Sequence, residues 1–262
     1  MANYADKGDK DRIAAVKAEM RRSFGIRVAA SRFRQDNRGF YIDRAANTIS
    51  DALTSIKHIG RRTAQKLFEW RERQYKTFSD LLADMEFDPA FDSHAVDILI
   101  RLGYFQEFGS AGKLLKVHAA FHEGEIRFSK AHIPATQQKR LTALRAFERS
   151  LEESGVPLAE QIRFEVEYAG APLTVCERER DLYAVLDVDE RYSPKLRLYS
   201  VSTGRTGVMK VKKPLFRTQP LKGGDMLRIL DWQRRPAYQY IDGKPCPRPG
   251  VSELWLEAYE KI

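Results

Sequence analysis

Two pairs of residues have the chemical types and the spacing to share a metal ion. Asp187 and Asp189 alternate in a strand-like stretch, so their carboxylates would lie on one face and could hold Mg²⁺, as in a metal-dependent nuclease. His118 and His122 are four residues apart on an expected helix, but "HAAFH" lacks the glutamate of a zinc-protease helix. Neither pair is accompanied by a third ligand. We therefore expect no metal, no cofactor and no catalytic residue, and we expect the histidine pair at the surface.

A group of basic residues around a glycine turn has a more specific pattern. The stretch "IKHIGRRTAQK", residues 56–66, joins a short expected helix over 51–57 to an amphipathic helix over 61–73. A helix N-terminus offers free backbone N–H groups and the positive end of the helix dipole, which together bind anions. Glycine in a left-handed turn lets a phosphate approach the backbone, and we assign that role to Gly60. The pattern is typical of the helix-hairpin-helix motif, which binds the DNA backbone without reading sequence.

The hairpin supplies the first candidate binding site. Ile56 and Ile59 would anchor the turn, while Ala64 and Leu67 would pack the two helices together. The residues expected to face the phosphates of duplex DNA are Lys57, His58, Gly60, Arg61, Arg62, Thr63 and Lys66. His58 occupies a position that is usually glycine in this motif, although histidine tolerates a positive φ better than most side chains. The alternative is an ordinary helical corner with a solvated basic helix.

The charge distribution supports a polyanionic partner. The 262 residues carry a net charge of +9, and basic residues outnumber acidic ones by 18 to 10 over residues 1–80. The balance reverses to 12 against 16 over 81–180 and returns to 15 against 10 over 181–262, with 14 against 3 inside 191–248. Two basic regions separated by an acidic one predict two contact surfaces for one ligand.

Cysteine usage and hydropathy exclude several classes of protein. Two cysteines without a CxxC pattern indicate neither a disulfide scaffold nor a structural zinc site. The chain has no apolar signal core and no run of about 18 apolar residues, so we expect no membrane contact and a cytoplasmic protein.

The elements that must position these residues indicate an α+β chain. Short helices are expected over 51–57, 61–73, 77–85, 93–103 and 110–121, followed by a linking helix over 137–154. A helix is also expected over 8–23, and residues 25–30 and 40–50 are expected to be short extended segments. After Gly155 five segments alternate with period two, over 182–192, 195–204, 206–213, 225–232 and 253–262. They predict a small OB-like β-barrel after the helical domain, or alternatively an open five-stranded sheet.

The second candidate binding site lies on two of these strands. In "KLRLYSV" and "VMKVKK" apolar and basic residues alternate, so one face of the paired strands would carry Arg197, Tyr199, Lys210 and Lys212. Basic residues mixed with an aromatic ring are typical of surfaces that bind single-stranded DNA. The alternative is a solvated sheet face.

The order of these segments resembles the α subunit of bacterial DNA polymerase III, the family C replicative polymerases. "YADKGDKDRIAAVKAEMRRSFGIRV" is similar to the end of the fingers region, and "ALTSIKHIGRRTAQKLFEWR" to the helix-hairpin-helix of that family. "TFSDLL" and "VDILIRLGYFQEFGSAGKLL" are similar to the second half of the tandem domain, and "IRFEVEYAGAPL" to the connector. "YSPKLRLYSVSTG" and "LKGGDMLRILDW" resemble the OB domain of phage-type members. The resemblance predicts a fingers-like tail over 1–50, a helix-hairpin-helix DNA-binding domain over 51–130, a connector over 131–180 and an OB-like domain over 181–262.

This resemblance implies a function in DNA replication without catalysis. In the family three metal-binding aspartates lie in a palm domain upstream of the fingers, so we expect a separate catalytic chain, in a bacterial cell or a phage-infected host. One domain would grip the duplex and the other the single-stranded template. The family's Pro-Pro-Asp-x-Asn stretch is replaced by Ala30–Arg34, and no clamp peptide is found, so sliding-clamp binding is not predicted. The alternatives are a free-standing DNA-binding accessory protein and a nuclease that uses Asp187 and Asp189.

Overall fold

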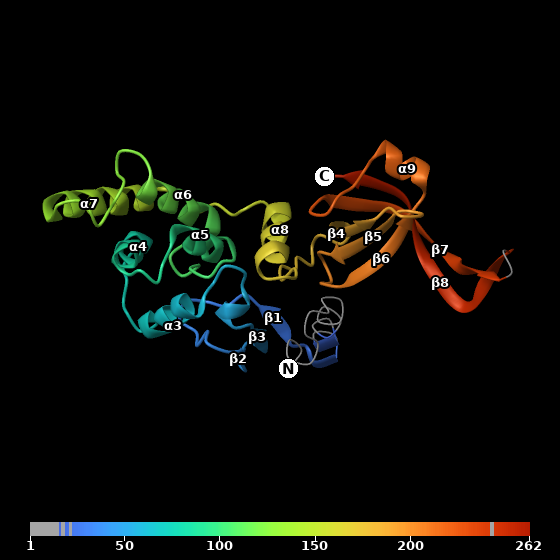
Figure 1. Cartoon of the computed structure of the whole chain (residues 1–262), viewed down its shortest axis with the longest axis horizontal. Coiled ribbons are helices and arrows are strands. Elements are labelled where there is room, and N and C mark those ends of the chain that lie inside the picture. The colour runs from blue at the N-terminus through green and yellow to red at the C-terminus, as the bar shows by residue number, and fades with distance from the viewer. Residues whose placement is uncertain (1–15, 17–18, 21–22, 242–243) are drawn as a thin grey trace. The chain divides into compact units, whose positions relative to one another are not determined.

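The computed structural model describes residues 16, 19–20, 23–241 and 244–262, and the helix expected over 8–23 lies largely outside them. The chain divides into two compact units. We call Glu19–Ala171 the hairpin unit and Pro172–Ile262 the sheet unit, and each is described by itself (Figure 1).

A small three-stranded sheet opens the hairpin unit. Strands β1 (Arg27–Ala29) and β2 (Tyr41–Asp43) both pair with β3 (Thr48–Ser50), β1 in parallel and β2 antiparallel. The extended segment expected over 40–50 is therefore two strands, because the chain reverses between them with Asn47 at a φ of 51°. Asparagine is one of the few non-glycine residues that accept this left-handed conformation.

Helices make up the rest of the hairpin unit. They are the 3₁₀ helix η1 (Leu53–Ser55), α3 (Arg61–Trp70), α4 (Phe78–Phe87), α5 (Ser93–Arg101), α6 (Ala111–His122), α7 (Pro134–Ser150) and α8 (Leu158–Tyr168). The patterns that predicted η1 and α3–α7 are found as helices with shifted ends. The sequence reasoning missed α8, whose residues were assigned to a connector of unspecified structure.

One hydrophobic core joins these helices. Phe33, which precedes the three-stranded sheet's second strand, is 1% exposed and packs against the rings of Tyr104, Phe105 and Phe108. Helix α7 packs on α4 and α6 through the fully buried Leu144, in keeping with the linking helix expected there. Residues at the end of the expected fingers-like tail therefore contribute to the core of the hairpin unit.

The sheet unit contains five strands whose pairing closes on itself. Strands β4 (Leu182–Asp189), β5 (Lys195–Ser200), β6 (Thr206–Val211), β8 (Lys244–Lys261) and β7 (Met226–Ile241) are neighbours in that order, and β7 also pairs with β4. The short helix α9 (Lys213–Thr218) follows β6. Leu196, Leu198, Met209, Val211 and Leu256 lie in the core, as their alternation with polar residues predicts.

Strands β7 and β8 are longer than the sequence pattern indicated. They pair from Leu227↔Lys261 out to Ile241↔Lys244, and the far end of this hairpin projects beyond the other strands (Figure 1). Three register shifts interrupt the pairing. The sequence did not indicate strands in this part of the chain because it contains prolines at 236, 245, 247 and 249, and proline is tolerated mainly at strand edges and bulges.

Across the described part of the chain, no helix has the length and apolar character needed to cross a membrane. Cys176 and Cys246 are free thiols.

Candidate nucleic-acid interface

The turn before α3 has its left-handed residue at His58. The N–H of Ile59 donates to the carbonyl of Ile56 at 3.1 Å, which closes a four-residue turn, and His58 has a φ of 69°. Gly60 has a φ of −81° and a ψ of 163°, which is extended backbone that any residue can adopt. The expectation that Gly60 provides the left-handed turn is therefore wrong. The turn places its positive φ at the third position, where type II turns favour glycine.

Gly60 contributes space and an open helix end. It is the N-cap residue of α3, and because it is glycine it has no side chain that could cap the helix. The first turn of α3 contains no acidic residue. A β-carbon added there would have no atom within 4 Å. Among the described residues, no group accepts a hydrogen bond from the backbone N–H of Arg61, Arg62 or Thr63. Free N–H groups at a helix start, with the helix dipole behind them, favour an anion.

The other three helices of this region begin differently. Thr77 and the buried carboxylate of Glu148 accept hydrogen bonds from the start of α4, the latter from Phe78 N at 2.8 Å and Ser79 N at 2.9 Å. Asp92 accepts from Ala95 N at the start of α5. At the start of α6, Glu153 accepts from Ser110 N at 2.6 Å.

The Glu153 carboxylate also receives a hydrogen bond from Lys113 at 2.8 Å. These two contacts, the lysine first, lower the pKa of Glu153 to about 2. The neighbouring backbone is close as well, since a β-carbon on Gly112 would lie 2.4 Å from the carbonyl oxygen of Ser154. The start of α6 is thus occupied by the chain's own carboxylate, whereas the start of α3 is open.

Three basic side chains surround the open end of α3. Lys57, Arg61 and Arg62 are exposed, and within the described part of the chain none of their side chains has a hydrogen-bond or ion-pair partner. His58 is exposed beside them, with its ring 5.1 Å from that of His94 and 6.4 Å from that of Tyr168. Together they form a local concentration of positive charge at free N–H groups.

Two residues assigned to the phosphate contact are bound internally. Thr63 is 7% exposed, and its hydroxyl donates to the carbonyl of Ala90 at 2.7 Å. Lys66 forms ion pairs with Glu69 at 3.2 Å and Asp88 at 3.4 Å, which raise the pKa of its ammonium group. Both lie on the side of α3 that packs toward the loop after α4, so the expectation that they face a ligand is corrected.

The hairpin turn is held in place from two sides. Ile59, Ala64 and Leu67 are buried in the core, and Ile56 packs against it, as the sequence predicted. In addition, the N–H of Lys57 donates to the carbonyl of Tyr168 at the end of α8. Sequence reasoning missed this second support, because α8 lies about a hundred residues further along the chain.

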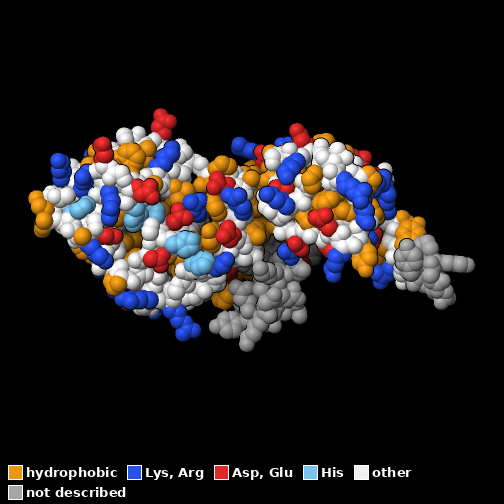
Figure 2. All heavy atoms as spheres, turned by 45° about the horizontal axis from the view of Figure 1, so that its top comes forward, with side chains coloured by type: hydrophobic (Ala, Val, Ile, Leu, Met, Phe, Trp, Pro, Cys, Tyr) orange, Lys and Arg blue, Asp and Glu red, His pale blue; other side chains and the backbone are white. Residues whose placement is uncertain are grey.

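One face of the molecule shows how its charged side chains are distributed. On the face shown in Figure 2, Lys and Arg side chains alternate with Asp and Glu instead of forming one continuous patch. We therefore expect an anion to bind at local groups, such as the start of α3, and not to a broad surface of positive charge.

In the sheet unit, β5 and β6 pair antiparallel as expected, from Lys195↔Lys210 to Tyr199↔Thr206. Tyr199, however, is 3% exposed, and its hydroxyl donates to the carbonyl of Thr174 at 2.7 Å. The segment that leads into the sheet covers this position, so Tyr199 is not the exposed ring that strand alternation predicted.

The two lysines of that face are held by acidic partners. Lys210 pairs with Glu253 at 2.6 Å and Lys212 with Glu257 at 3.0 Å, both on β8. Arg197 lies opposite Asp187 on β4 and Val208 on β6. These positions share the outer surface of the sheet, but the aromatic ring on it comes from β8, where Trp255 pairs with Lys210.

The candidate metal-binding pairs have other roles. Asp189 forms an ion pair with Arg191 at 3.0 Å, which lowers its pKa to about 2, and a register shift separates Val185 from Asp187. His118 is 6% exposed, not at the surface as expected, and burial lowers its pKa to about 4. Among the described residues, no group of three or more His, Cys, Asp or Glu side chains could hold a metal ion.

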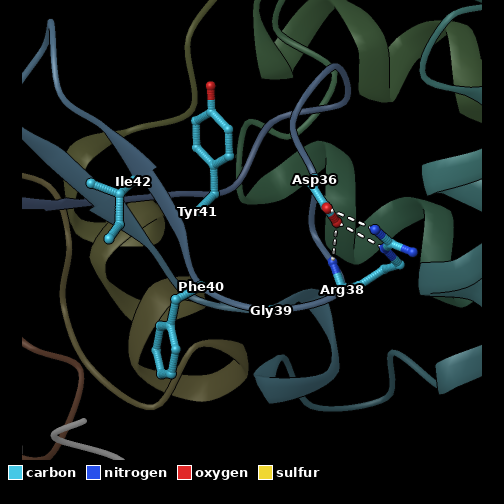
Figure 3. Close-up of a pocket in the computed structure, with 6 residues that line it drawn as sticks. All are labelled: Asp36, Arg38, Gly39, Phe40, Tyr41 and Ile42. Carbon is cyan, nitrogen blue, oxygen red and sulfur yellow. Dashed lines mark hydrogen bonds and ion pairs between the residues drawn. The ribbon is translucent and has the colours of Figure 1, made fainter.

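A shallow cavity of about 530 Å³ lies beside β2 in the hairpin unit. Figure 3 shows Asp36 and Arg38 turned toward each other and joined by hydrogen bonds of 3.0 and 2.9 Å, while Tyr41 points away from Phe40. The Arg38 guanidinium also lies 3.5 Å from the centre of the Phe68 ring on α3. Phe40 and Ile42 are 41% and 61% exposed, so this edge of the small sheet presents apolar surface.

Comparison with known proteins supports the hairpin. A family model described as a helix-hairpin-helix motif matches residues 25–114. That range includes the three-stranded sheet, η1, α3, α4, α5 and the start of α6. None of the curated proteins compared with the chain is similar to it. The chain thus contains a helix-hairpin-helix motif in a mixed α+β structure, and this motif indicates nucleic-acid binding.

Proposed function

We propose that the hairpin unit binds the sugar-phosphate backbone of duplex DNA at the start of α3. The observation that carries this proposal is the uncapped end of α3, where free N–H groups lie among the unpartnered side chains of Lys57, Arg61 and Arg62. One DNA phosphate would accept hydrogen bonds from the backbone beside Gly60, and the arginines would contact its neighbours. Such contacts carry no sequence information, so binding would be independent of sequence.

We further propose that the chain is a non-catalytic, DNA-holding portion of a family C replicative DNA polymerase. The ordered resemblance to the polymerase III α subunit supports this, together with the motif match at residues 25–114. In this proposal residues 1–50 are a fingers-like tail, 51–130 the duplex-binding domain, 131–180 a connector and 181–262 an OB-like domain for the single-stranded template. The self-closing order of the five strands is compatible with an OB-like barrel.

The catalytic partner would be a separate chain that carries the palm, in the cytoplasm of a bacterium or phage-infected host. The edge strand β2 supports a partner surface, because Ile42 within the strand and Phe40 just before it are exposed. Asp187 and Asp189 offer no support for a nuclease, since Asp189 pairs with Arg191. If no palm-containing protein of the source binds this chain, a free-standing DNA-binding accessory protein is the better description.

Duplex binding is tested by its salt dependence. If Lys57, Arg61 and Arg62 each neutralise one phosphate, the logarithm of the association constant should fall with the logarithm of the salt concentration at a slope of about −3. Arg61→Gln combined with Arg62→Gln should reduce the slope to about −1 and weaken binding about tenfold or more. The matched control is Lys66→Gln, which also removes a positive charge from α3 but at a lysine already paired with Asp88 and Glu69.

A second variant tests the backbone contact without removing charge. Gly60→Val should fold normally, because the φ of −81° suits valine and the added atoms meet open space. Its side chain would occupy the phosphate position and weaken duplex binding. Duplex binding that is insensitive to salt, or a folded Gly60→Val variant that binds as tightly as the wild type, would overturn the proposal.

A further inference from the structure

A groove on the sheet unit combines aromatic rings with fixed cations. Its volume is about 600 Å³, and its lining includes Tyr192 from the β4–β5 turn, Lys210 from β6, Arg235 and Tyr238 from β7, and Glu253 and Trp255 from β8. Of these residues, only Lys210 was expected from the sequence to bind a single strand. All of them belong to the sheet unit.

Strand register brings the groove residues together on the outer surface. Trp255 lies opposite Lys210 on one side and Gln233 on the other, and Arg235 lies opposite Glu253. The residues that alternate with them, Met209, Val211 and Leu256, are buried in the core. The groove residues that belong to strands therefore lie on the face opposite to the core, and Tyr192 joins them from the β4–β5 turn.

Three aromatic side chains with different exposure define the groove. Tyr192 is 76% exposed and Tyr238 is 58% exposed, while Trp255 is half-buried between strands. Two exposed rings in one groove can both stack on the same planar ligand, which isolated surface rings cannot do. Among the described residues, neither tyrosine hydroxyl forms a hydrogen bond.

The cations of the groove are oriented by ion pairs. Lys210 is bound to Glu253 at 2.6 Å and lies 5.6 Å from the centre of the Trp255 ring. Arg235 is bound to Glu257 and lies 5.3 Å from the same ring. Both charged groups are thus held beside the indole, where they can contact an anionic ligand without first being ordered.

We propose that this groove holds an unstacked base of a single-stranded nucleic acid, between Tyr192 and Tyr238. The inference rests on the proposed function, in which the sheet unit contacts a single-stranded template. Bases of a single strand have free π faces, whereas those of a duplex are already stacked, so the groove selects single strands. Lys210 and Arg235 lie where they can contact the flanking phosphates. The surrounding segment 191–248, with 14 basic and 3 acidic residues, complements a polyanion.

The test uses the full chain with two labelled ligands of equal length, an oligothymidylate and an abasic deoxyribose-phosphate strand. Tyr192→Ala and Tyr238→Ala should each weaken oligothymidylate binding about tenfold, which corresponds to a stacking contribution of about 1.4 kcal/mol. On the abasic strand the same variants should bind as the wild type does, because that ligand has no base to stack. Trp232→Ala is the matched control, since Trp232 is a half-exposed ring of the sheet unit outside the groove.

Two results would overturn the proposal. The first is that either tyrosine variant binds oligothymidylate as tightly as the wild type. The second is that polyglutamate displaces oligothymidylate and the abasic strand equally well, because the groove would then be a general anion-binding surface. Failure here is separable from failure of duplex binding, because Arg61→Gln with Arg62→Gln should weaken the duplex complex and leave oligothymidylate binding unchanged.

Discussion

The backbone N–H of Lys57 donates to the carbonyl oxygen of Tyr168 at 2.9 Å, so the hairpin turn is bonded to the last residue of α8. The two residues are separated by more than a hundred positions, and His58 lies against the Tyr168 ring at the same place. The conformation of the hairpin thus depends on a helix outside the matched motif, since the family match ends at residue 114.

A substitution that destabilises α8 should therefore increase the local opening of the hairpin turn. Phe164 is 7% exposed and lies under the Arg101 guanidinium, so Phe164→Ala should lower the free energy of unfolding by about 3 kcal/mol. Amide hydrogen exchange at Lys57 should accelerate more than exchange at Leu67 inside α3. The control is Arg163→Ala, at an exposed neighbour on the same helix. Equal acceleration at Lys57 and Leu67 would contradict a local link.

The left-handed residue of the turn can be tested by substitution. His58→Val should lower the free energy of unfolding by about 1 to 2 kcal/mol, because a β-branched residue is poorly accommodated at a φ of 69°. His58→Gly should be tolerated, since glycine adopts this conformation freely. Urea denaturation measures both. Equal stability of the valine and glycine variants would mean that residue 58 is not left-handed in solution.

Stability should fall in mildly acidic solution because of His118. Burial lowers its pKa from 6.5 to about 4, so the folded protein binds fewer protons than the unfolded chain between these values. The free energy of unfolding should therefore be constant above pH 6.5 with respect to this group and decrease by up to about 3 kcal/mol as the pH falls to 4. In His118→Gln this decrease should be smaller, as measured by denaturation across the pH range. An unchanged pH profile in the variant would exclude His118 as the cause.

The proposed assembly with a palm-carrying chain predicts a partner surface at the exposed edge of the small sheet. Ile42→Asp should weaken co-purification of the two chains about tenfold or more, since it places a charge on apolar surface beside β2. Ile133→Asp is the matched control, because Ile133 is an equally exposed isoleucine of the hairpin unit at the start of α7. Deleting residues 1–34 would not test this surface, because it would remove Phe33 from the core. Equal binding by both variants would place the partner elsewhere.

Local sequence patterns predicted the elements that have strong periodicity. The apolar positions Ala64 and Leu67 located α3, and the alternation in "KLRLYSV" located β5 together with its buried leucines. These signals succeed because helix and strand periods follow directly from backbone geometry. The hairpin could be recognised in the sequence for the same reason.

Contacts between distant segments could not be obtained this way. The pattern placed Tyr199 outside, but it cannot show that the backbone at Thr174 covers it. It identified Lys66 and Lys210 as basic, but not that they form ion pairs with Asp88 and Glu253. The assignment of left-handed backbone to Gly60 instead of His58 failed because glycine permits a positive φ without requiring it.

Glu153 at the start of α6 makes the N-termini of α3 and α6 unequal as sites for the phosphates of the proposed DNA ligand. A pair of helices with two open N-termini could bind both strands of the duplex at once. Of α3 and α6, only α3 has an open N-terminus, and in the described part of the chain Lys57, Arg61 and Arg62 are unpartnered beside it. A grip on so few phosphates has a short residence time, and because it reads no bases, each release can be followed by rebinding one step further along. The hairpin unit would then act as a sliding guide that keeps the duplex near its partners while the duplex translocates.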